Sequence, residues 1–489
     1  MSGRAPARSL PALLALLGTL AAPGCGGEGD AGPPSVILVS IDTLRADHVG
    51  CYGYGRDTTP NLDRFAREGV LFESHVSSTS WTLPAHAALF TAVPDSVHGC
   101  VEATGQALSP EFETLAERFA AGGYATAGFF AGPYLHEAFG LGQGFETYRY
   151  CVEDDGTFAG ERRGEWANDP HAHRRSHEGV TNDRVYAAAR SWIEAHRGEP
   201  FFCFVHFWDV HFDFTPPWPW NERFDPDYDG PVDGRNFFFD PAIGPDMPAR
   251  DREHLIALYD GEIAWTDTFL GELREDLEDW GLARSTVVAV TSDHGTELFD
   301  HGRKGHRQTL YDEVIRVPLV LWAPGRVEAG RRVRAQTRSI DVAPTLLELA
   351  DLPGMTGALG ESLMPLARGE AAGPGKPAVS ELYSVGARLR TVRTLRDKLW
   401  YDENTPGDPV RWFDLEDDPR EMRPQVDLDA PRARALHALF LRTVAELREA
   451  AARRPGDPLE LEVPAAVLEE LRANGYVGGA GDEDGDGSD

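Results

Sequence analysis

The feature that most constrains the fold is an alternation of short apolar runs with amphipathic helical segments. Apolar runs typical of buried strands occupy residues 36–41, 124–130, 201–207, 285–291 and 317–322. Helical patterns occupy residues 59–68, 110–121, 182–196 and 252–280. Strands separated by helices predict an α/β fold, in which a large, mixed but mostly parallel sheet is sandwiched by helices.

The pattern of predicted strands and helices changes after about residue 375, beyond a Gly/Pro-rich stretch at residues 369–377. Shorter strand patterns appear at 388–401 and 410–415, and a charged amphipathic helix covers 431–451. We therefore expect a catalytic domain at 36–375 and a smaller C-terminal α+β subdomain with an antiparallel sheet at 376–480.

Both ends of the chain are expected to lie outside these domains. Residues 1–25 combine a basic start at Arg4 and Arg8 with an apolar run that is too short to span a membrane, as in an export signal. Small residues precede Cys25, so lipidation of that cysteine and simple cleavage both remain open. Residues 26–35 read as a flexible tether and 481–489 as a disordered acidic tail. The expected location is periplasmic, anchored to a membrane as a lipoprotein, or secreted.

The charge of the chain limits the kinds of partner that it can bind. With 47 Lys and Arg against 79 Asp and Glu, the chain carries a formal charge of −32. So acidic a protein repels phosphate backbones, which argues against nucleic acid as a general partner. An anionic substrate would require positive charge held locally. Beside Cys25, four cysteines remain, and an oxidising compartment would allow one or two disulfides among Cys51, Cys100, Cys151 and Cys203.

Polar side chains follow three of the predicted strands. Asp42 follows the first strand, Asp293 and His294 follow the run that ends at Thr291, and residues 206–211 close another with two histidines and an aspartate. In a doubly wound sheet, active residues lie beyond the carboxyl ends of strands. Carboxylate and imidazole groups together suit a divalent cation such as zinc or manganese.

The segment at residues 80–99 adds a candidate nucleophile. Thr82 precedes Pro84 and a run of small residues that begins a helix. A hydroxyl at a helix N-terminus lies where backbone N–H groups and the helix dipole favour a developing anion. A nearby metal would lower the pKa of this hydroxyl further. The simpler interpretation is that Thr82 only caps the helix.

Together these motifs resemble the sulfatase family of the alkaline phosphatase superfamily. The resemblance runs from Val36 to about Tyr476, and it is carried in order by VILVSIDTLRADHVGCYGY, WTLPAHAALFT, FFCFVHFWDVH, VVAVTSDHGTELFDHGRKGHRQTLYDE and WFDLEDDPRE. It implies an alkaline-phosphatase-like fold and hydrolysis of an anionic ester.

Position by position, the resemblance implies the roles of eight residues. Asp42, Asp293 and His294 correspond to metal ligands, with Thr43 where the family has a second aspartate. His211 is similar to a histidine that contacts the substrate or protonates its leaving group, and His306 lies near a family lysine that holds the anion. His301 and His86 are further candidates for binding the substrate. The nucleophile position is held by Thr82.

The nucleophile position also marks a departure from the family. Sulfatases that work through formylglycine need a Cys or Ser at the head of a C-x-P-x-R-like pattern, whose side chain another enzyme oxidises, whereas this chain has Thr82 there and His86 in place of the arginine. Because threonine cannot become formylglycine, an active site here would use the hydroxyl itself. The chain then resembles phosphoryl-transferring members of the superfamily, such as nucleotide phosphodiesterases and phosphoethanolamine transferases.

The number of metal ions stays open at this point. One divalent cation, namely Ca²⁺, Mn²⁺, Zn²⁺ or Mg²⁺, is expected at Asp42, Asp293 and His294. For a second cation, alternate residues of an extended segment would have to share a face, and His211, Asp209 and Asp213 have that spacing, with His206 nearby. The simpler interpretation is that Asp209 and His206 orient their neighbours.

The sequence thus predicts an exported, metal-dependent hydrolase of sulfate or phosphate esters with Thr82 as nucleophile. The substrate would be a small, or glycan- or lipid-linked, anionic ester. One alternative is a phosphodiesterase or a phosphoryl-group transferase of the same superfamily, and another is an inactive binding protein on the same fold. The oligomeric state and the alcohol half of the ester do not follow from the sequence.

Overall fold

We analysed a computed structural model of the chain. It describes residues 32–102, 105–151, 181–384, 387–405, 410–460 and 463–473, together with residues 1 and 3. The chain divides into two compact units at residues 1–32 and 33–489, and the account below concerns the second. The predictions for the export signal, Cys25, most of the tether and the acidic tail lie outside the described residues.

The main sheet is mixed and mostly parallel, as predicted. Among the described residues it has nine strands in the order β10-β2-β11-β7-β1-β6-β4-β5, and β12 pairs with β2. The strands are β1 (Ser35–Ile41), β2 (Val70–Val76), β4 (Ala125–Phe130), β5 (Thr147–Tyr150), β6 (Phe201–Phe207), β7 (Thr286–Thr291), β10 (Arg316–Val317), β11 (Leu319–Trp322) and β12 (Arg331–Arg338). Pairs around β1 are parallel, whereas β11 runs antiparallel to β7 and β2.

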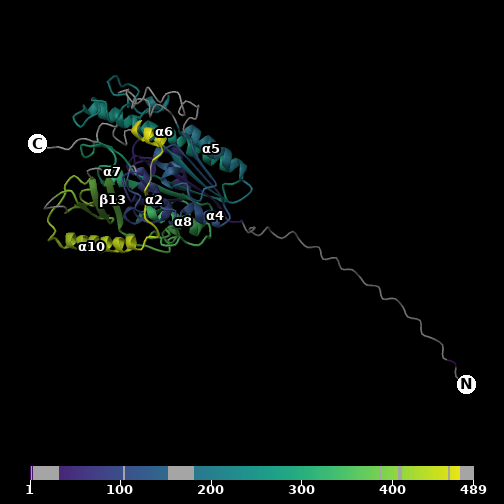
Figure 1. The fold of residues 1–489 in the computed structure, drawn as a ribbon. Coiled ribbons are helices and arrows are strands. Elements are labelled where there is room, and N and C mark those ends of the chain that lie inside the picture. The colour runs from purple at the N-terminus through teal and green to yellow at the C-terminus, as the bar shows by residue number, and fades with distance from the viewer. Residues whose placement is uncertain are drawn as a thin grey trace. The chain divides into compact units, whose positions relative to one another are not determined.

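Helices cover both faces of this sheet (Figure 1). On one face α1 (Pro60–Glu68), α5 (Asn182–Ala195) and α6 (Ala249–Asp279) pack on alternate residues of β1 such as Ile37 and Val39. On the other face α2 (Thr82–Thr91), α4 (Leu115–Ala121) and α8 (Val342–Leu349) share a core with Val36 and Leu38. Because successive strand residues point to opposite faces, a continuous apolar strand needs cover on both sides.

The register of the central strands determines where the polar strand ends meet. Ser40 of β1 lies beside His206 of β6 and beside Thr291 of β7. All three strands are parallel, so their carboxyl ends reach the same edge of the sheet. The residues that follow these strands therefore lie close together in space. They are Asp42, Asp293 and the segment after β6.

The C-terminal part contains a four-stranded antiparallel sheet. Its strands are β13 (Ala378–Ser384), β14 (Ala387–Arg393), β15 (Asp397–Asp402) and β16 (Val410–Asp414), and α10 (Pro431–Ala452) packs on one face. The other face joins the core of the main sheet through side chains such as Leu382 and Phe413. Ser380 Oγ donates to the carbonyl of Ser77 at 2.6 Å, so β13 runs directly beside the segment that leads to α2.

Smaller elements complete the unit. They are α3 (Asp95–His98), α7 (Asp312–Ile315), α9 (Met364–Ala367), α11 (Ala465–Ala473), the paired strands β3 (Gln106–Ala107) and β17 (Leu459–Glu460), the pair β8 (Glu297–Leu298) and β9 (Lys304–Gly305), and 3-10 turns at Ala46–His48, Gly50–Tyr52, Pro133–Leu135, Glu137–Phe139, Trp220–Glu222 and Ser339–Asp341. None of the described helices is long and apolar enough to cross a bilayer.

Several predicted elements differ from the structure. The helix expected at residues 110–121 begins only at Leu115, because Thr114 and Glu117 form a reciprocal capping box there. The strand expected at 317–322 is interrupted at Pro318, which has no N–H to donate, and it continues as the antiparallel β11. The strands β2 and β12 were not predicted.

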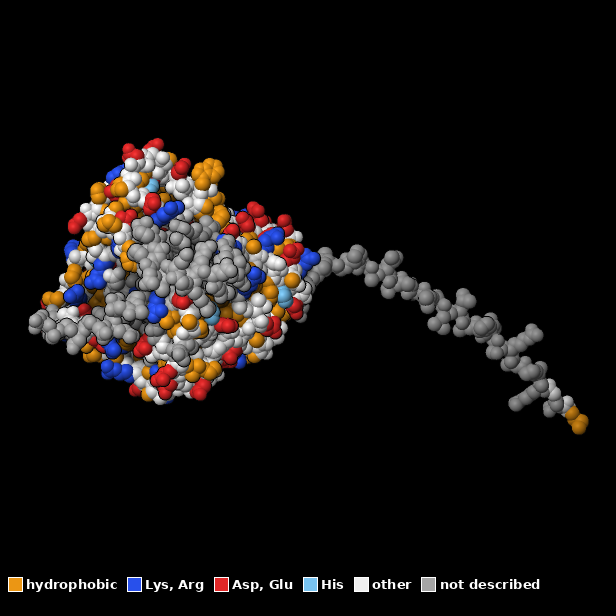
Figure 2. Space-filling view, turned by 45° about the horizontal axis from the view of Figure 1, so that its top comes forward, with side chains coloured by type: hydrophobic (Ala, Val, Ile, Leu, Met, Phe, Trp, Pro, Cys, Tyr) orange, Lys and Arg blue, Asp and Glu red, His pale blue; other side chains and the backbone are white. Residues whose placement is uncertain are grey.

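The surface carries charges of both signs, and the cysteines are not bridged. On the face shown in Figure 2, acidic and basic side chains are interspersed. The four cysteines considered for disulfides, Cys51, Cys100, Cys151 and Cys203, are free thiols, so none of the bridges that an oxidising compartment would allow is formed among them.

A buried ion network ties the C-terminal sheet to the loop before β10. Asp312 at the start of α7 lies 2.7 Å from Arg393 and 3.2 Å from Lys398, and Lys398 lies 2.8 Å from Glu421. The side chain of Lys398 is fully buried. Glu421 also accepts the backbone N–H of Asp312 at 2.6 Å. Each charge in the network has an opposite partner, which burial requires.

Replacing Lys398 with methionine should destabilise the protein strongly. Lys398→Met removes the cation between Asp312 and Glu421, so the free energy of unfolding should fall by about 3–5 kcal/mol. The matched control is Lys376→Met at an exposed pair with Glu361, which should change stability by less than about 0.5 kcal/mol. Urea unfolding of both variants measures the difference, and equal effects would contradict the role of the network.

Candidate active site

The predicted nucleophile, Thr82, lies at the first turn of α2. It is the first residue of this ten-residue helix, and Trp81 precedes it in an extended conformation. Its side chain is 3% exposed. Thr82 Oγ1 lies 3.4 Å from Nε2 of His294. The N–H groups of the first turn and the helix dipole therefore act on the same hydroxyl that faces the predicted metal ligands.

The three predicted metal ligands converge beside this hydroxyl. Asp42, Asp293 and His294 each offer one ligand atom, and these atoms lie within 4.8 Å of one another. His294 Nε2 is 3.4 Å from Asp293 Oδ2 and 3.8 Å from Asp42 Oδ1. Asp42 and His294 are fully buried, and Asp293 is 4% exposed. Sequence positions 42 and 293 therefore meet in one compact group.

The carboxylates of this group lack the partners that burial demands. Neither oxygen of Asp42 has a hydrogen-bond partner among the described residues, and the same holds for Asp293 Oδ2. Burial raises the pKa of Asp42 to about 7, against the opposing effect of His294. Burial, and then the charge of Asp42, also raise the pKa of Asp293. Three orphaned carboxylate oxygens around one point fit a divalent cation, which would neutralise both groups.

Neighbouring groups hold these ligands in place. Asp293 Oδ1 accepts the backbone N–H of His294 at 2.8 Å and that of Thr43 at 3.3 Å, which leaves Oδ2 to face the centre. His294 donates from Nδ1 to the carbonyl of Gly295 at 2.8 Å, so its Nε2 carries the lone pair toward the centre. The hydroxyl of Thr43 donates to Val210 O at 2.8 Å instead of facing the group.

His211 and His306 form a second pair of rings on the same side. Their Nε2 atoms are 3.3 Å apart, and His211 Nδ1 lies 3.1 Å from the carbonyl of Phe212. The His306 ring lies 4.6 Å from that of His294, centroid to centroid. Burial, followed by the neighbouring His294, lowers the pKa of His306 well below its usual value. Both histidines are thus brought to the site as predicted.

His86 lies behind the nucleophile instead of beside a substrate. It is fully buried, its Nδ1 lies 2.9 Å from the carbonyl of Thr82, and its Nε2 lies 3.0 Å from Ser40 Oγ. Burial lowers its pKa to about 3, so the ring is neutral. The expectation that His86 binds the anion in place of an arginine finds no support in this geometry.

His301 is also directed elsewhere. Its Nδ1 lies 2.5 Å from Glu313 Oε1 and its Nε2 lies 3.3 Å from the carbonyl of Glu421, while its ring stacks on Tyr311 at 3.6 Å. Both nitrogens are therefore engaged in fixing the loop before α7. The structure thus places His301 in this loop and outside the group of Asp42, Asp293 and His294, and its predicted contact with the substrate stays a prediction.

Asp209 and Asp213 do not form the metal face that their spacing suggested. Asp209 accepts the backbone N–H groups of Thr181 and Asn182 at the start of α5. Asp213 accepts those of Asn236 and Phe237. The segment after β6 turns, since the N–H of His211 bonds back to the carbonyl of Trp208, and alternate residues therefore no longer share a face.

Two acidic side chains of α6 are also buried. Glu262 and Asp267 of α6 are 3% and 2% exposed. Asp267 accepts the N–H groups of Asn61 and Leu62 in the first turn of α1, at 2.8 Å each. It therefore supports that helix.

The sequence did not single out Ser40 or Arg307. Ser40 is a polar residue in an otherwise apolar strand, and this could have marked it in the sequence. Its side chain contacts His86. Arg307 follows His306, and its guanidinium lies 4.5 Å from the centroid of the Trp81 ring. The backbone N–H of Arg307 donates to Ser80 O at 3.2 Å, so this cation adjoins the start of α2.

Comparison with known proteins identifies the family. Residues 34–352 match the family described as Sulfatase, and residues 300–449 match the one described as N-sulphoglucosamine sulphohydrolase, C-terminal. The chain belongs to the sulfatase family of ester hydrolases.

Individual relatives share a low sequence identity with this chain over long stretches. The steryl-sulfatase of Mus musculus is 25% identical, over 69% of this chain and 66% of its own length. A multifunctional alkaline phosphatase superfamily protein of Trinickia caryophylli is 27% identical over 69% and 77%. The phosphonate monoester hydrolase of Agrobacterium radiobacter superimposes with a TM-score of 0.68 and 24% identity, covering 86% of this chain and 96% of its own. The last likeness shows the α/β fold.

The pairing of His301 with Glu313 makes a prediction about titration. The Glu313 carboxylate outweighs the effect of burial and raises the pKa of His301. Glu313→Gln should therefore lower this pKa toward or below its usual value of about 6.5. Because a raised pKa stabilises the folded state below the unfolded value, the variant should lose more stability at pH 5.5 than at pH 8.

Proton NMR of the imidazole rings, assigned with His301→Gln, measures the pKa. The stability change follows from urea unfolding at both pH values. An unchanged pKa in Glu313→Gln would contradict the pairing.

Proposed function

We propose that this protein is a metal-dependent hydrolase of sulfate or phosphate esters in which the unmodified hydroxyl of Thr82 is the nucleophile. The observation that carries the proposal is the position of Thr82 Oγ1, at the N-terminus of α2 and 3.4 Å from His294 Nε2. The orphaned carboxylates of Asp42 and Asp293 belong to the same group. A helix cap alone would not require these partners.

The reaction proceeds by double displacement. Thr82 Oγ1 gives its proton to water and forms a bond to the sulfur or phosphorus atom, while the bond from that atom to the alcohol oxygen breaks. Water then gives a proton to His211 as it attacks the Thr82 ester. The bond from Thr82 Oγ1 to the sulfur or phosphorus atom breaks, and Oγ1 takes a proton back from the solvent. The first turn of α2 stabilises the negative charge on Oγ1 in both steps.

His211 protonates the leaving group, and His306 orients His211. His211 donates from Nδ1 to the carbonyl of Phe212, and its Nε2 faces Nε2 of His306 at 3.3 Å. A proton on His211 Nε2 makes this ring the acid, with neutral His306 as the acceptor that orients it. His211 passes that proton to the departing alcohol oxygen.

Asp42, Asp293 and His294 would hold the divalent cation, and Thr82 would complete the set. When bound, such a cation supplies Lewis-acid stabilisation of the oxygens that become negative. The residues of the chain provide the rest of the site. Thr43 N–H and the Gly295 carbonyl keep Asp293 and His294 in their orientations.

Removing the nucleophile should abolish turnover without unfolding the protein. Thr82→Ala should lower kcat/KM by at least about 10³-fold, whereas Thr82→Ser keeps a hydroxyl and should retain measurable activity. A control is Thr79→Ala, a buried hydroxyl in the preceding segment, which should remain within about tenfold. Near-normal turnover by Thr82→Ala, in protein shown to be folded by circular dichroism, would exclude this mechanism.

The role of His211 predicts a dependence on the leaving group. His211→Gln should slow esters of poorly acidic alcohols by about 10²–10⁴-fold, and nitrophenyl esters far less, because nitrophenolate departs without a proton. Steady-state kinetics on a series of aryl and alkyl esters gives the slope of log(kcat/KM) against the alcohol pKa. A slope identical to that of the wild type would remove His211 from this role.

Chelation should inactivate the enzyme. Dialysis against a chelator removes the cation that balances Asp42 and Asp293, and adding back one of Mn²⁺, Zn²⁺, Ca²⁺ or Mg²⁺ should restore turnover. The assay should include aryl sulfates, phosphate mono- and diesters and phosphonates, since the site geometry suits any tetrahedral anionic ester. Full activity in metal-free protein, verified by elemental analysis, would refute metal dependence.

A further inference from the structure

The charges at the candidate site leave an anionic ester without a balancing cation. Asp42 and Asp293 bring two carboxylates to the group that Thr82 adjoins. One divalent cation would balance these two charges, and no positive charge would then remain for a substrate that is itself negative. Transfer of a sulfate or phosphate group also needs positive charge near its oxygens. A further cation therefore has to come from another part of the chain.

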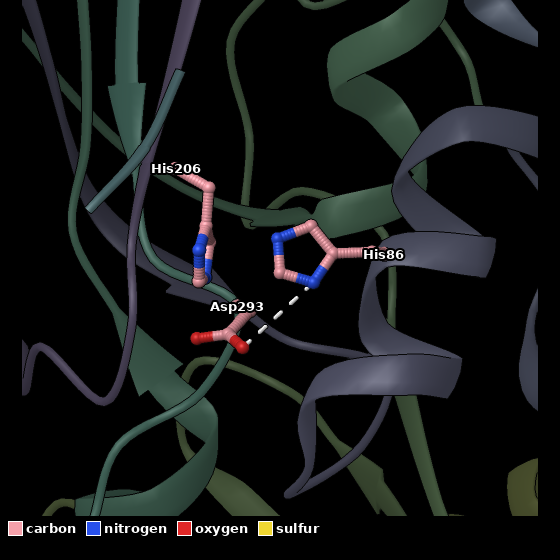
Figure 3. Close-up of side chains that lie close together, drawn as sticks. All are labelled: His86, His206 and Asp293. Atoms are coloured by element: carbon pink, nitrogen blue, oxygen red, sulfur yellow. Dashed lines mark ion pairs between the residues drawn. The ribbon is translucent and has the colours of Figure 1, made fainter. Parts of the chain in front are cut away.

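The histidine that stands at the position of the family's arginine does not supply this charge. Figure 3 shows the ring of His86 beside His206 and Asp293, in the interior of the protein. Its Nδ1 lies 2.9 Å from the carbonyl of Thr82, so this nitrogen donates a hydrogen bond to the backbone. Burial lowers the pKa of His86 to about 3, and the ring is neutral.

Two cations that lie near the site residues in the sequence are held by other groups. The guanidinium of Arg45 lies 2.8 Å from a carboxylate oxygen of Asp47 and 2.7 Å from one of Asp300. The ammonium of Lys304 donates to two backbone carbonyls, at 2.6 Å each. Arg307, in the same loop as Lys304, is placed differently.

Arg307 lies between the histidine pair and the start of α2. It follows His306, whose ring lies 4.6 Å from that of His294, centroid to centroid. On the other side, its backbone N–H donates to Ser80 O at 3.2 Å, two residues before Thr82. Its charge also reaches His306, because after burial and the neighbouring histidines it is a further cause of the lowered pKa of that ring. Arg307 is therefore at the edge of the candidate site.

The guanidinium of Arg307 rests on two buried aromatic rings. Its Cζ lies 4.5 Å from the centroid of the Trp81 ring and 5.7 Å from that of Tyr134. The two rings meet edge to face at 5.3 Å, and each side chain is 1% exposed. Nη1 donates to the hydroxyl of Tyr134 at 3.3 Å. Because a guanidinium has several N–H donors, it can contact Tyr134 and an anion at the same time.

The backbone of Arg307 adopts a conformation that favours glycine. Its φ angle is +66°, in the left-handed region that costs energy for a residue with a Cβ atom. Its carbonyl accepts a hydrogen bond from Ser384 Oγ at 3.2 Å, and its N–H is bonded to Ser80, so neighbouring segments hold this conformation. Strain of this kind often marks functional sites. An arginine at such a position indicates a use for its side chain.

We propose that Arg307 binds the outer oxygens of the sulfate or phosphate group while this group is transferred to Thr82, an inference that rests on the proposed function. The planar guanidinium offers parallel N–H donors that match two oxygens of a tetrahedral anion, which a neutral imidazole cannot do. Arg307 thus supplies the positive charge that His86 was expected to supply. Trp81, which directly precedes the nucleophile, supports the cation from below through its ring.

Kinetics of variants with matched changes of charge test this role. Arg307→Gln should lower kcat/KM for aryl sulfates and phosphate diesters by about 10–100-fold, because a hydrogen bond to a charged group is lost. Arg303→Gln removes the same charge from an exposed position in the same loop and should remain within about twofold of the wild type. Equal losses in the two variants, or no loss in Arg307→Gln, would overturn the proposal.

Binding of inorganic anions separates a contact with the substrate from support of the fold. Arg307→Gly removes the side chain and suits the φ angle of +66°, so the loop should keep its conformation. Calorimetric titration of the full-length, metal-loaded protein with sulfate and with phosphate measures the Kd. The Kd should rise by about 10–100-fold in Arg307→Gly at unchanged metal content, and less in Arg307→Lys, which keeps the charge. An unchanged Kd in Arg307→Gly would overturn the proposal.

The failure of this role and the failure of the proposed function give different results. If Thr82→Ala abolishes turnover while Arg307→Gln keeps the turnover and the sulfate affinity of the wild type, the proposed function stands and Arg307 has no part in it. If the wild type hydrolyses no ester but loses affinity for sulfate and phosphate in Arg307→Gly, the proposed function fails and the anion site at Arg307 stands.

Discussion

Two carboxylates buried next to one another are the constraint on which the rest of this structure depends. Asp42 and Asp293 lie in the interior, and three of their four oxygens have no hydrogen-bond partner among the described residues. Without a cation this arrangement is expensive, and the raised pKa of each group expresses that penalty. The hydroxyl of Thr82 lies 3.4 Å from Nε2 of His294, which belongs to the same group. These carboxylates destabilise the fold because they lack partners. The same carboxylates can hold the cation that would activate a hydroxyl nucleophile.

The geometry of the sheet explains why such a group can exist. Three parallel strands, β7, β1 and β6, end at one edge, and each contributes polar residues just beyond its last apolar position. The start of α2 supplies Thr82 to the same place. The C-terminal sheet supports this edge from behind through Ser380, whose hydroxyl bonds to Ser77, and through the Asp312 network near His301. The site is thus held by elements far apart in the sequence.

The sequence predicted the features that depend on local patterns. Asp42, Asp293 and His294 were candidates because strand ends in parallel sheets have a fixed place, but their roles as metal ligands, and that of Thr82 as nucleophile, were implied by the resemblance to sulfatases. The directions of His86 and His301 were not predictable, because their partners, Ser40 and Glu313, are fixed only by tertiary packing. The suggested role of Asp209 as a metal ligand does not fit for a similar reason. A turn after β6 places its carboxylate at the start of α5. The antiparallel course of β11 follows from its neighbours in the sheet, which no local pattern encodes.

The central claim is that Asp42 and Asp293 repel each other until a cation binds, and the stability of Asp42→Asn tests it most directly. Unfolding in urea is compared for wild type and variant, first in metal-free buffer and then with saturating Mn²⁺ or Zn²⁺. The account predicts that the metal-free variant is more stable than the metal-free wild type, and that the cation stabilises the wild type much more than the variant. A variant that is less stable without metal, or a cation that stabilises neither protein, would contradict the account.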